Sequence, residues 1–273
     1  GTSDEIPKYD LYYNSVRSES SSAFQLFSAA LELFQQPSEG WFQIGNPLDG
    51  DLATDKDVTG MMFSMIGPML VLVFLFSGCM AVAPESIAGE KERGTFATML
   101  VTPVKRSHIA IGKIIALSTL SLISGICSFL GIILSLPKLV GGTGNISATV
   151  YTASDYIMLL GIVLSSVLVI VALISLISAF AKSVKEATNM IGPLMILVVL
   201  LGVSTMFTSG SAGAFFWYLI PLYNSARAMS GIFSFAASPL NVIITIASNL
   251  VVALLLAFAL AKMFDNEKIM FNK

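Results

Sequence analysis

The chain has 273 residues, of which 55% are hydrophobic and only 12% are charged, and its formal net charge at pH 7 is −2. With a mean hydropathy of +0.82, this composition excludes an ordinary water-soluble domain and predicts an integral membrane protein. Five stretches lack Asp, Glu, Lys and Arg, and each can hold a membrane span of about 20 residues: 58–84, 114–137, 156–181, 187–226 and 228–261.

Residues 1–59 are strongly acidic, with ten acidic side chains against three basic ones. A run of serines is followed by apolar residues at three-to-four spacing, which predicts an amphipathic helix that ends before Pro37; these apolar residues are Phe24, Phe27, Leu31 and Phe34. Four aspartates follow, but they lack the glycine and the terminal glutamate of a calcium-binding loop. We interpret them as a solvated acidic surface: Asp49, Asp51, Asp55 and Asp57.

Residues 60–273 are expected to form a transmembrane domain. Its apolar segments are continuous and do not alternate with a period of two, so we expect helices and not barrel strands, because lipid-facing backbone must satisfy its own hydrogen bonds. The fold class is therefore an all-α polytopic membrane protein. Gly67-Pro68 and Gly192-Pro193 fall inside two of the helices and indicate a kink or a functional hinge. The five predicted spans are roughly 60–83, 111–136, 156–181, 188–208 and 241–261.

Residues 209–240 are apolar, but Pro221 and a run of small residues divide them into pieces too short to cross a bilayer. The pieces 214–220 and 222–236 contain several aromatic residues, which favour the level of the lipid headgroups. We expect two short, re-entrant or surface helices on the outer side. Two interpretations are open: a cap packed on the bundle, or a guide for a leaving substrate.

The distribution of Lys and Arg predicts the orientation of the chain. Ten of these residues fall in 84–113, in 182–187 and after residue 261, whereas the opposite loops carry only Lys138 and Arg227. The first set should face the cytoplasm, which places the carboxyl terminus inside and residues 1–59 outside. An outer amino terminus needs an export segment. We therefore expect a sixth span before Gly1, on a longer form of the chain or on another chain.

Residue types that carry enzyme chemistry are scarce. His108 is the single histidine, and Cys79 and Cys127 both fall in predicted spans without metal-ligand spacing, so a zinc site or a disulfide is not expected. No phosphate-binding loop of the Gly-x-x-x-x-Gly-Lys-Ser/Thr type occurs, and we expect no nucleotide hydrolysis by this chain. The spans also lack the ionisable groups typical of ion-coupled carriers.

Five charges are concentrated between Glu85 and Arg93, between two predicted spans. Pro84 suits the first turn of a helix, Glu85 complements its dipole, and Gly94 suits its end, so we predict a short cytoplasmic helix over 84–93. Such a helix offers specific charged contacts to a soluble partner. The alternative is an ordinary solvated inner loop that sets the orientation of the chain.

The run Glu85–Thr95, followed by Met99–Val104 and Gly112-Lys113, resembles the membrane permeases of the second class of ABC exporters, and the sodium-export branch in particular. The resemblance covers 60–273, with five of the family's six spans, and is most specific at the sequence Gly-Glu-Lys-Glu-Arg-Gly-Thr. The chain departs from the family in lacking the first span. Its outer segment is also short for the large outer domain typical of that branch.

The resemblance implies that two permeases pair, as a homodimer or a heterodimer, and that each docks an ABC ATP-binding subunit. ATP and Mg would belong to that subunit, and this chain would hold no cofactor. Membrane lipids are further partners, and we expect no nucleic acid. The resemblance implies that the residues coupling the permease to the ATPase are Glu85, Gly89, Glu90, Lys91, Glu92, Arg93, Gly94 and Thr95, with Arg106, Lys182, Lys185 and Glu186 as secondary contacts.

The sequence thus predicts the permease subunit of an ATP-driven exporter in a bacterial cell membrane. Uncharged spans favour a lipid, peptide or drug as the substrate, whereas the branch that the chain resembles suggests sodium. Two alternatives are retained. One is a membrane sensory or assembly protein that recruits an ATPase, and the other is an ion-coupled secondary carrier.

Overall fold

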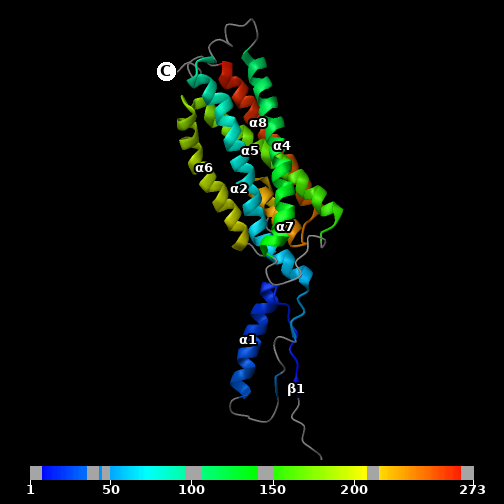
Figure 1. Cartoon of the computed structure of the whole chain (residues 1–273). Coiled ribbons are helices and arrows are strands. Elements are labelled where there is room, and N and C mark those ends of the chain that lie inside the picture. Colours follow the sequence, from blue (N-terminus) through cyan, green and yellow to red (C-terminus); the bar gives the residue numbers. More distant parts are fainter. Residues whose placement is uncertain are drawn as a thin grey trace, which may run out of the picture. The chain divides into compact units, whose positions relative to one another are not determined.

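The computed structural model describes residues 8–35, 43–44, 50–95, 106–140, 151–207 and 215–265 (Figure 1). The chain divides into two compact units, 1–61 and 62–273. The main helices are α1 (Ser18–Gln35), α2 (Asp55–Glu92), α4 (Arg106–Val140), α5 (Ala153–Phe180), α6 (Val184–Ser204), α7 (Tyr223–Phe233) and α8 (Pro239–Asp265).

The first unit contains the amphipathic helix predicted from the phenylalanine spacing. This helix, α1, starts at Ser18. Just before it, the Asn14 side chain accepts hydrogen bonds from the Val16 and Arg17 amides. The Phe24 ring stacks on Tyr13 with 3.9 Å between the ring centroids. Two-residue strands, β1 (Lys8–Tyr9) and β2 (Gln43–Ile44), flank this helix in the sequence and pair in parallel.

Two aspartates of the acidic run bond to nearby backbone. The Asp51 carboxylate accepts hydrogen bonds from the amides of Ser15 and Ala53, both at 3.0 Å, and hydrogen bonds from Ser15 and Ala53 hold the pKa of Asp51 below its ordinary value. The Asp57 carboxylate accepts hydrogen bonds from the Thr54 amide at 3.0 Å and from the Thr54 hydroxyl at 2.7 Å. The amide of Thr54, the residue just before α2, thereby has a hydrogen-bond acceptor. Asp49 lies outside the described residues.

The second unit is a bundle of membrane-spanning helices. Among the described residues, five helices are long and apolar enough to cross a membrane, at Lys56–Glu92, Ile111–Gly131, Ala153–Phe180, Val184–Ser204 and Pro239–Phe264. The prediction of an all-α polytopic membrane protein with these five spans is confirmed. The largest difference from the predicted bounds is in the first span, which continues well beyond residue 83.

Helix α5 forms the centre of the bundle and packs against α4, α6, α7 and α8. Of its most apolar stretch, 61% is buried inside the protein, compared with 22% to 39% for the other spans. Small residues allow the neighbouring helices to approach closely. At Gly125 of α4, an added methyl group would lie 2.8 Å from Val167 of α5, and at Gly202 of α6 it would lie 2.8 Å from the backbone of Met69 in α2.

The prediction of a separate short helix starting at Pro84 is wrong. Residues 84–92 are helical, but they are the last turns of α2, which runs through the buried Pro84 without a break. A proline inside a helix removes one backbone hydrogen bond, and a membrane helix tolerates this loss when its neighbours pack around it. The predicted end is correct, since Gly94 has a φ of 73° and its amide donates to the Lys91 carbonyl at 3.1 Å.

Among the described residues between the last two spans, and apart from the single turn η3 that directly follows α6, two short helices lie where they were predicted. The first is the 3-10 helix η4 (Phe215–Leu219), which follows a gap in the described residues after η3 (Thr205–Phe207), and the second is α7. Helix α7 packs on α5 and α8, and its inner side chains Ala226, Met229 and Ile232 are almost fully buried. This packing favours the interpretation of η4 and α7 as a cap on the bundle.

Candidate functional site

The charged segment Glu85–Thr95 lies at one end of the bundle, where α2 ends, α4 starts, α5 ends and α6 starts. We call this the charged end. Ile87, Ala88 and Gly89 are buried on one side of the segment. Its other residues divide into two groups. Ser86, Glu90 and Lys91 are half-buried, whereas the exposed residues are Glu85, Glu92, Arg93, Gly94 and Thr95.

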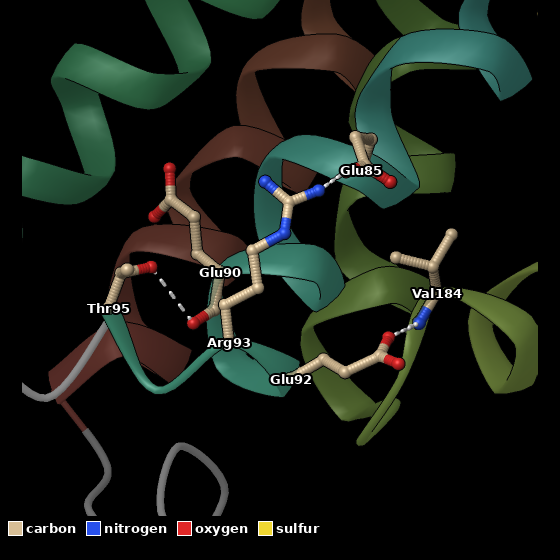
Figure 2. A network of polar contacts seen from close by, with 6 residues as sticks. All are labelled: Glu85, Glu90, Glu92, Arg93, Thr95 and Val184. Atoms are coloured by element: carbon tan, nitrogen blue, oxygen red, sulfur yellow. Dashed lines mark hydrogen bonds and ion pairs between the residues drawn. The ribbon is translucent and has the colours of Figure 1, made fainter.

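Two contacts stay within the segment (Figure 2). The Arg93 guanidinium forms an ion pair with the Glu85 carboxylate two turns earlier, and both side chains remain largely exposed. The Thr95 hydroxyl donates to the Glu90 carbonyl at 3.2 Å, beyond the last turn of α2. An exposed ion pair contributes little to stability, about 0.2–1 kcal/mol. Breaking the Glu85–Arg93 pair therefore costs little, and either side chain can form an ion pair with a charge on another protein instead.

A third contact joins the segment to α4. The Lys113 ammonium lies 2.5 Å from the Glu90 carboxylate and also donates to the Ser86 carbonyl at 2.8 Å. The Lys113 side chain is only 11% exposed and the Glu90 side chain 24% exposed, so this pair is screened less than the Glu85–Arg93 pair. It fixes the end of α2 to the beginning of α4.

A fourth contact reaches the end of α5. The Lys91 ammonium donates to the carbonyl of Ala179, in the last turn of α5. The last carbonyls of a helix have no partner within the helix and carry partial negative charge, so a cation is favourable there.

A fifth contact reaches the start of α6. Glu92 extends to α6, and its carboxylate accepts the Val184 amide at 2.9 Å (Figure 2). Ser183 is the amino-terminal cap of α6 and accepts the Glu186 amide at 3.2 Å, while the Glu186 carboxylate accepts the Lys182 amide at 2.7 Å. Two carboxylates and a hydroxyl thus accept three amides at and just before this helix start, those of Lys182, Val184 and Glu186.

Comparison with known proteins identifies the family of this bundle. A family model described as "ABC-2 family transporter protein" matches residues 7–268. The chain belongs to the ABC-2 family of transporter proteins. The resemblance inferred from the Glu85–Thr95 run is therefore confirmed.

A second comparison agrees with this assignment to the ABC-2 family. A protein of Bacillus subtilis (strain 168) described as "ABC transporter permease protein NatB" is 31% identical over 236 residues, which are 80% of this chain and 59% of that protein. The ABC-2 chain thus spans about three fifths of the length of the curated relative that it matches. No solved structure matches the chain.

The charged end of this ABC-2 chain contains the residues singled out in the sequence. The segment Glu85–Thr95 and the link Lys182–Glu186 are brought together through Glu92 and Val184, and Lys182, Lys185 and Glu186 are exposed beside it. Arg106 begins α4, but its side chain lies outside the described residues. The role of these residues in coupling stays a prediction.

Sequence reasoning does not assign a role to several participants in these contacts, among them Ser86, whose carbonyl accepts from Lys113. Lys113 is part of the family resemblance without a role of its own, although a lysine just before a long apolar run is expected at the end of a bundle. Ala179 and Val184 take part only through their backbone. No side-chain pattern can identify such positions.

A second polar cluster in the ABC-2 chain lies deep in the bundle. The Asn249 side chain of α8 donates to the hydroxyls of Ser165 (3.2 Å) and Ser225 (2.8 Å), and the Asn224 side chain of α7 donates to the side-chain amide oxygen of Asn249 at 3.1 Å. Ser166 of α5 donates to Ser225 at 2.8 Å. All five side chains are at most 3% exposed. Their mutual bonds favour a role in helix packing, as expected for neutral polar groups in spans.

An apolar groove of about 140 Å³ lies among α4, α5 and α8. Leucine, isoleucine, valine and alanine side chains form most of its lining, with Ser118 and Ser175 as the polar members. None of the lining residues is charged. Its chemistry matches an apolar chain better than a hydrated ion.

Proposed function

We propose that the chain is the transmembrane permease subunit of an ATP-driven exporter and that its charged end docks a separate ABC ATP-binding subunit. The observation that carries this proposal is the location of the segment Glu85–Thr95. It presents exposed charges on one side and is bonded to α4, α5 and α6 on the other. A partner bound there acts on α2 and on three further spans at once.

Membership of the ABC-2 family supports the same proposal, because an ABC permease requires an ATP-binding partner. The sequence contains no Gly-x-x-x-x-Gly-Lys-Ser/Thr loop, so we assign ATP and Mg to the partner and no ATPase site to this chain. Two permease chains and two ATP-binding subunits would form the complete exporter. The excess of Lys and Arg near the charged end favours a location of that end in the cytoplasm of a bacterial cell.

For the substrate, we favour a lipid, peptide or drug with an apolar part over sodium. The groove among α4, α5 and α8 has an apolar lining without charge. The deep polar cluster consists of amides and hydroxyls that bond to one another. A screen for compounds that stimulate ATP hydrolysis by the reconstituted complex distinguishes these classes from sodium.

The docking proposal is tested by reversing one exposed charge. Arg93→Glu adds a third carboxylate to those of Glu85 and Glu92. We expect this change to weaken binding of the ATP-binding subunit to the permease in nanodiscs by roughly tenfold or more. The control is Arg17→Glu, the same change at an exposed arginine of the first unit, which should leave the Kd unchanged. Equal affinity of both variants and the unaltered chain would contradict docking at the charged end.

The alternatives predict different behaviour of the same preparation. A sensory or assembly protein binds the ATPase through the charged end but shows no ATP-driven movement of any substrate in vesicles. A secondary carrier moves its substrate under an imposed ion gradient without ATP. Transport that depends on ATP hydrolysis and not on a gradient excludes both.

A further inference from the structure

Two adjacent residues of α2 hold the connection between α5 and α6 from both sides. Lys91 bonds to the carbonyl of Ala179 at the end of α5, and Glu92 bonds to the amide of Val184 at the start of α6. Only residues 181–183 separate the two helices. The contacts therefore bracket a three-residue turn.

The charges of the two residues match the helix ends that they contact. The carbonyl end of α5 carries partial negative charge and meets the Lys91 ammonium, whereas the amide end of α6 carries partial positive charge and meets the Glu92 carboxylate. Exchanging the two charges would make both contacts unfavourable. The order Lys-Glu in the segment is therefore required by the order of the two helix ends.

Packing supports the same attachment. Ala181 in the turn and Ala187 in the first turns of α6 are fully buried. Gly89, one turn before Arg93 in α2, lies so close to α6 that an added methyl group would be 3.2 Å from the Val184 side chain. The end of α2 and the start of α6 thus touch through apolar atoms as well as through the Glu92 bond.

We propose that Lys91 and Glu92 are positioning residues that fasten the α5–α6 turn to the end of α2, so that a partner that moves the end of α2 also moves α5 and α6. This inference rests on the proposed function for the identity of the partner. Helix α5 is the central helix of the bundle and lines the apolar groove through Leu168, Val171 and Ser175. Movement at the charged end is thereby transmitted to the groove.

This role differs from docking in what a substitution should do. If Glu92 contacts the ATP-binding subunit, its removal weakens binding of that subunit. If Glu92 fastens the turn, its removal leaves binding intact and disconnects α6 from α2. Arg93, whose ion pair stays within the segment, belongs to the docking surface and serves as the contrast.

The first measurement uses the permease alone in nanodiscs. Hydrogen exchange at the Val184 amide should become roughly tenfold faster in Glu92→Ala, because the amide loses its acceptor. Glu92→Gln keeps an acceptor oxygen and should retain most of the protection. Asn189→Ala, a change at an exposed polar residue of the same helix, is the control and should have no effect at Val184. Unchanged exchange in Glu92→Ala would overturn the attachment, whatever the function of the protein.

The second measurement uses the complex with the ATP-binding subunit, with and without the ATP analogue AMP-PNP. In the unaltered complex, AMP-PNP should change the rate of hydrogen exchange in two peptides, 84–95 and 181–192. In Glu92→Ala, the nucleotide-induced change in hydrogen exchange should persist in peptide 84–95 but fall at least roughly threefold in peptide 181–192. The Kd of the ATP-binding subunit for the permease should stay within about twofold of its value for the unaltered chain. Glu92→Gln should restore the second response.

Two results would overturn the proposal at this step. One is a normal response of 181–192 in Glu92→Ala, and the other is a loss of subunit binding in that variant, which would make Glu92 a docking residue. Failure of the unaltered permease to bind the subunit would instead refute the proposed function. The attachment of the turn would still be decided by the exchange at Val184.

Discussion

At the scale of single residues, the charges of the segment Glu85–Thr95 fall into two classes. Glu85 and Arg93 pair with each other on the exposed side, so their charges can meet a partner at little cost. Glu90, Lys91 and Glu92 instead bond to α4, α5 and α6, respectively. Under the proposed function, one short run would carry both the surface for the ATP-binding subunit and the contacts that join this surface to α4, α5 and α6.

The half-buried pair of Lys113 and Glu90 provides a prediction at this scale. We expect Lys113→Met to destabilise the protein by about 1–3 kcal/mol, because the Glu90 carboxylate keeps its charge and loses its cation. Lys262→Met, the same change at an exposed lysine near the end of α8, is the control and should have little effect. Thermal unfolding in detergent measures both.

A double variant separates this pair from a simple loss of packing. Adding Glu90→Gln to Lys113→Met removes the unpaired charge, so part of the lost stability should return. If the two changes destabilise the protein additively, the ion pair has no role and the assignment is wrong.

At the scale of elements, sequence and structure differ where helices continue or meet. The five spans follow from uninterrupted apolar runs, and the end of α2 follows from Gly94. The continuation of α2 through Pro84 does not follow from the sequence, because a proline is equally compatible with the start of a new helix. The packing around the proline decides whether the helix continues. The Glu92–Val184 bond joins residues 92 positions apart and needs the folded arrangement of α2 and α6.

Close packing of α6 on α2 provides a prediction at the scale of elements. Gly202→Ala should destabilise the bundle by about 1–3 kcal/mol, because the new methyl group would lie 2.8 Å from the Met69 backbone. Gly192→Ala, in the same helix, is the matched control, since nothing lies within 4 Å of its added methyl group. Equal thermal stability of the two variants would contradict this packing.

The Gly192 variant also addresses the hinge interpretation of Gly192-Pro193. If this pair is only a kink, Gly192→Ala should leave ATP-driven transport unchanged. Reduced transport at normal stability would favour the functional hinge.

At the scale of the whole molecule, the second unit has a charged end and an apolar groove among α4, α5 and α8. Helix α5 connects the two, since its end contacts Lys91 and its middle lines the groove. Composition and the Glu85–Thr95 run were sufficient to predict the membrane fold and the ABC-2 family. The connection through α5 could not be predicted, because it depends on a backbone carbonyl, Ala179, that no sequence pattern marks.

The central claim is that the charged end is the surface at which an ATP-binding subunit docks. A photoreactive amino acid placed at residue 93, 185 or 17 of the permease, followed by illumination of the complex in nanodiscs, tests this claim most directly. We predict crosslinks to the ATP-binding subunit from positions 93 and 185 and none from position 17. Crosslinks from position 17 alone, or from none of the three positions in a complex that assembles, would contradict the account.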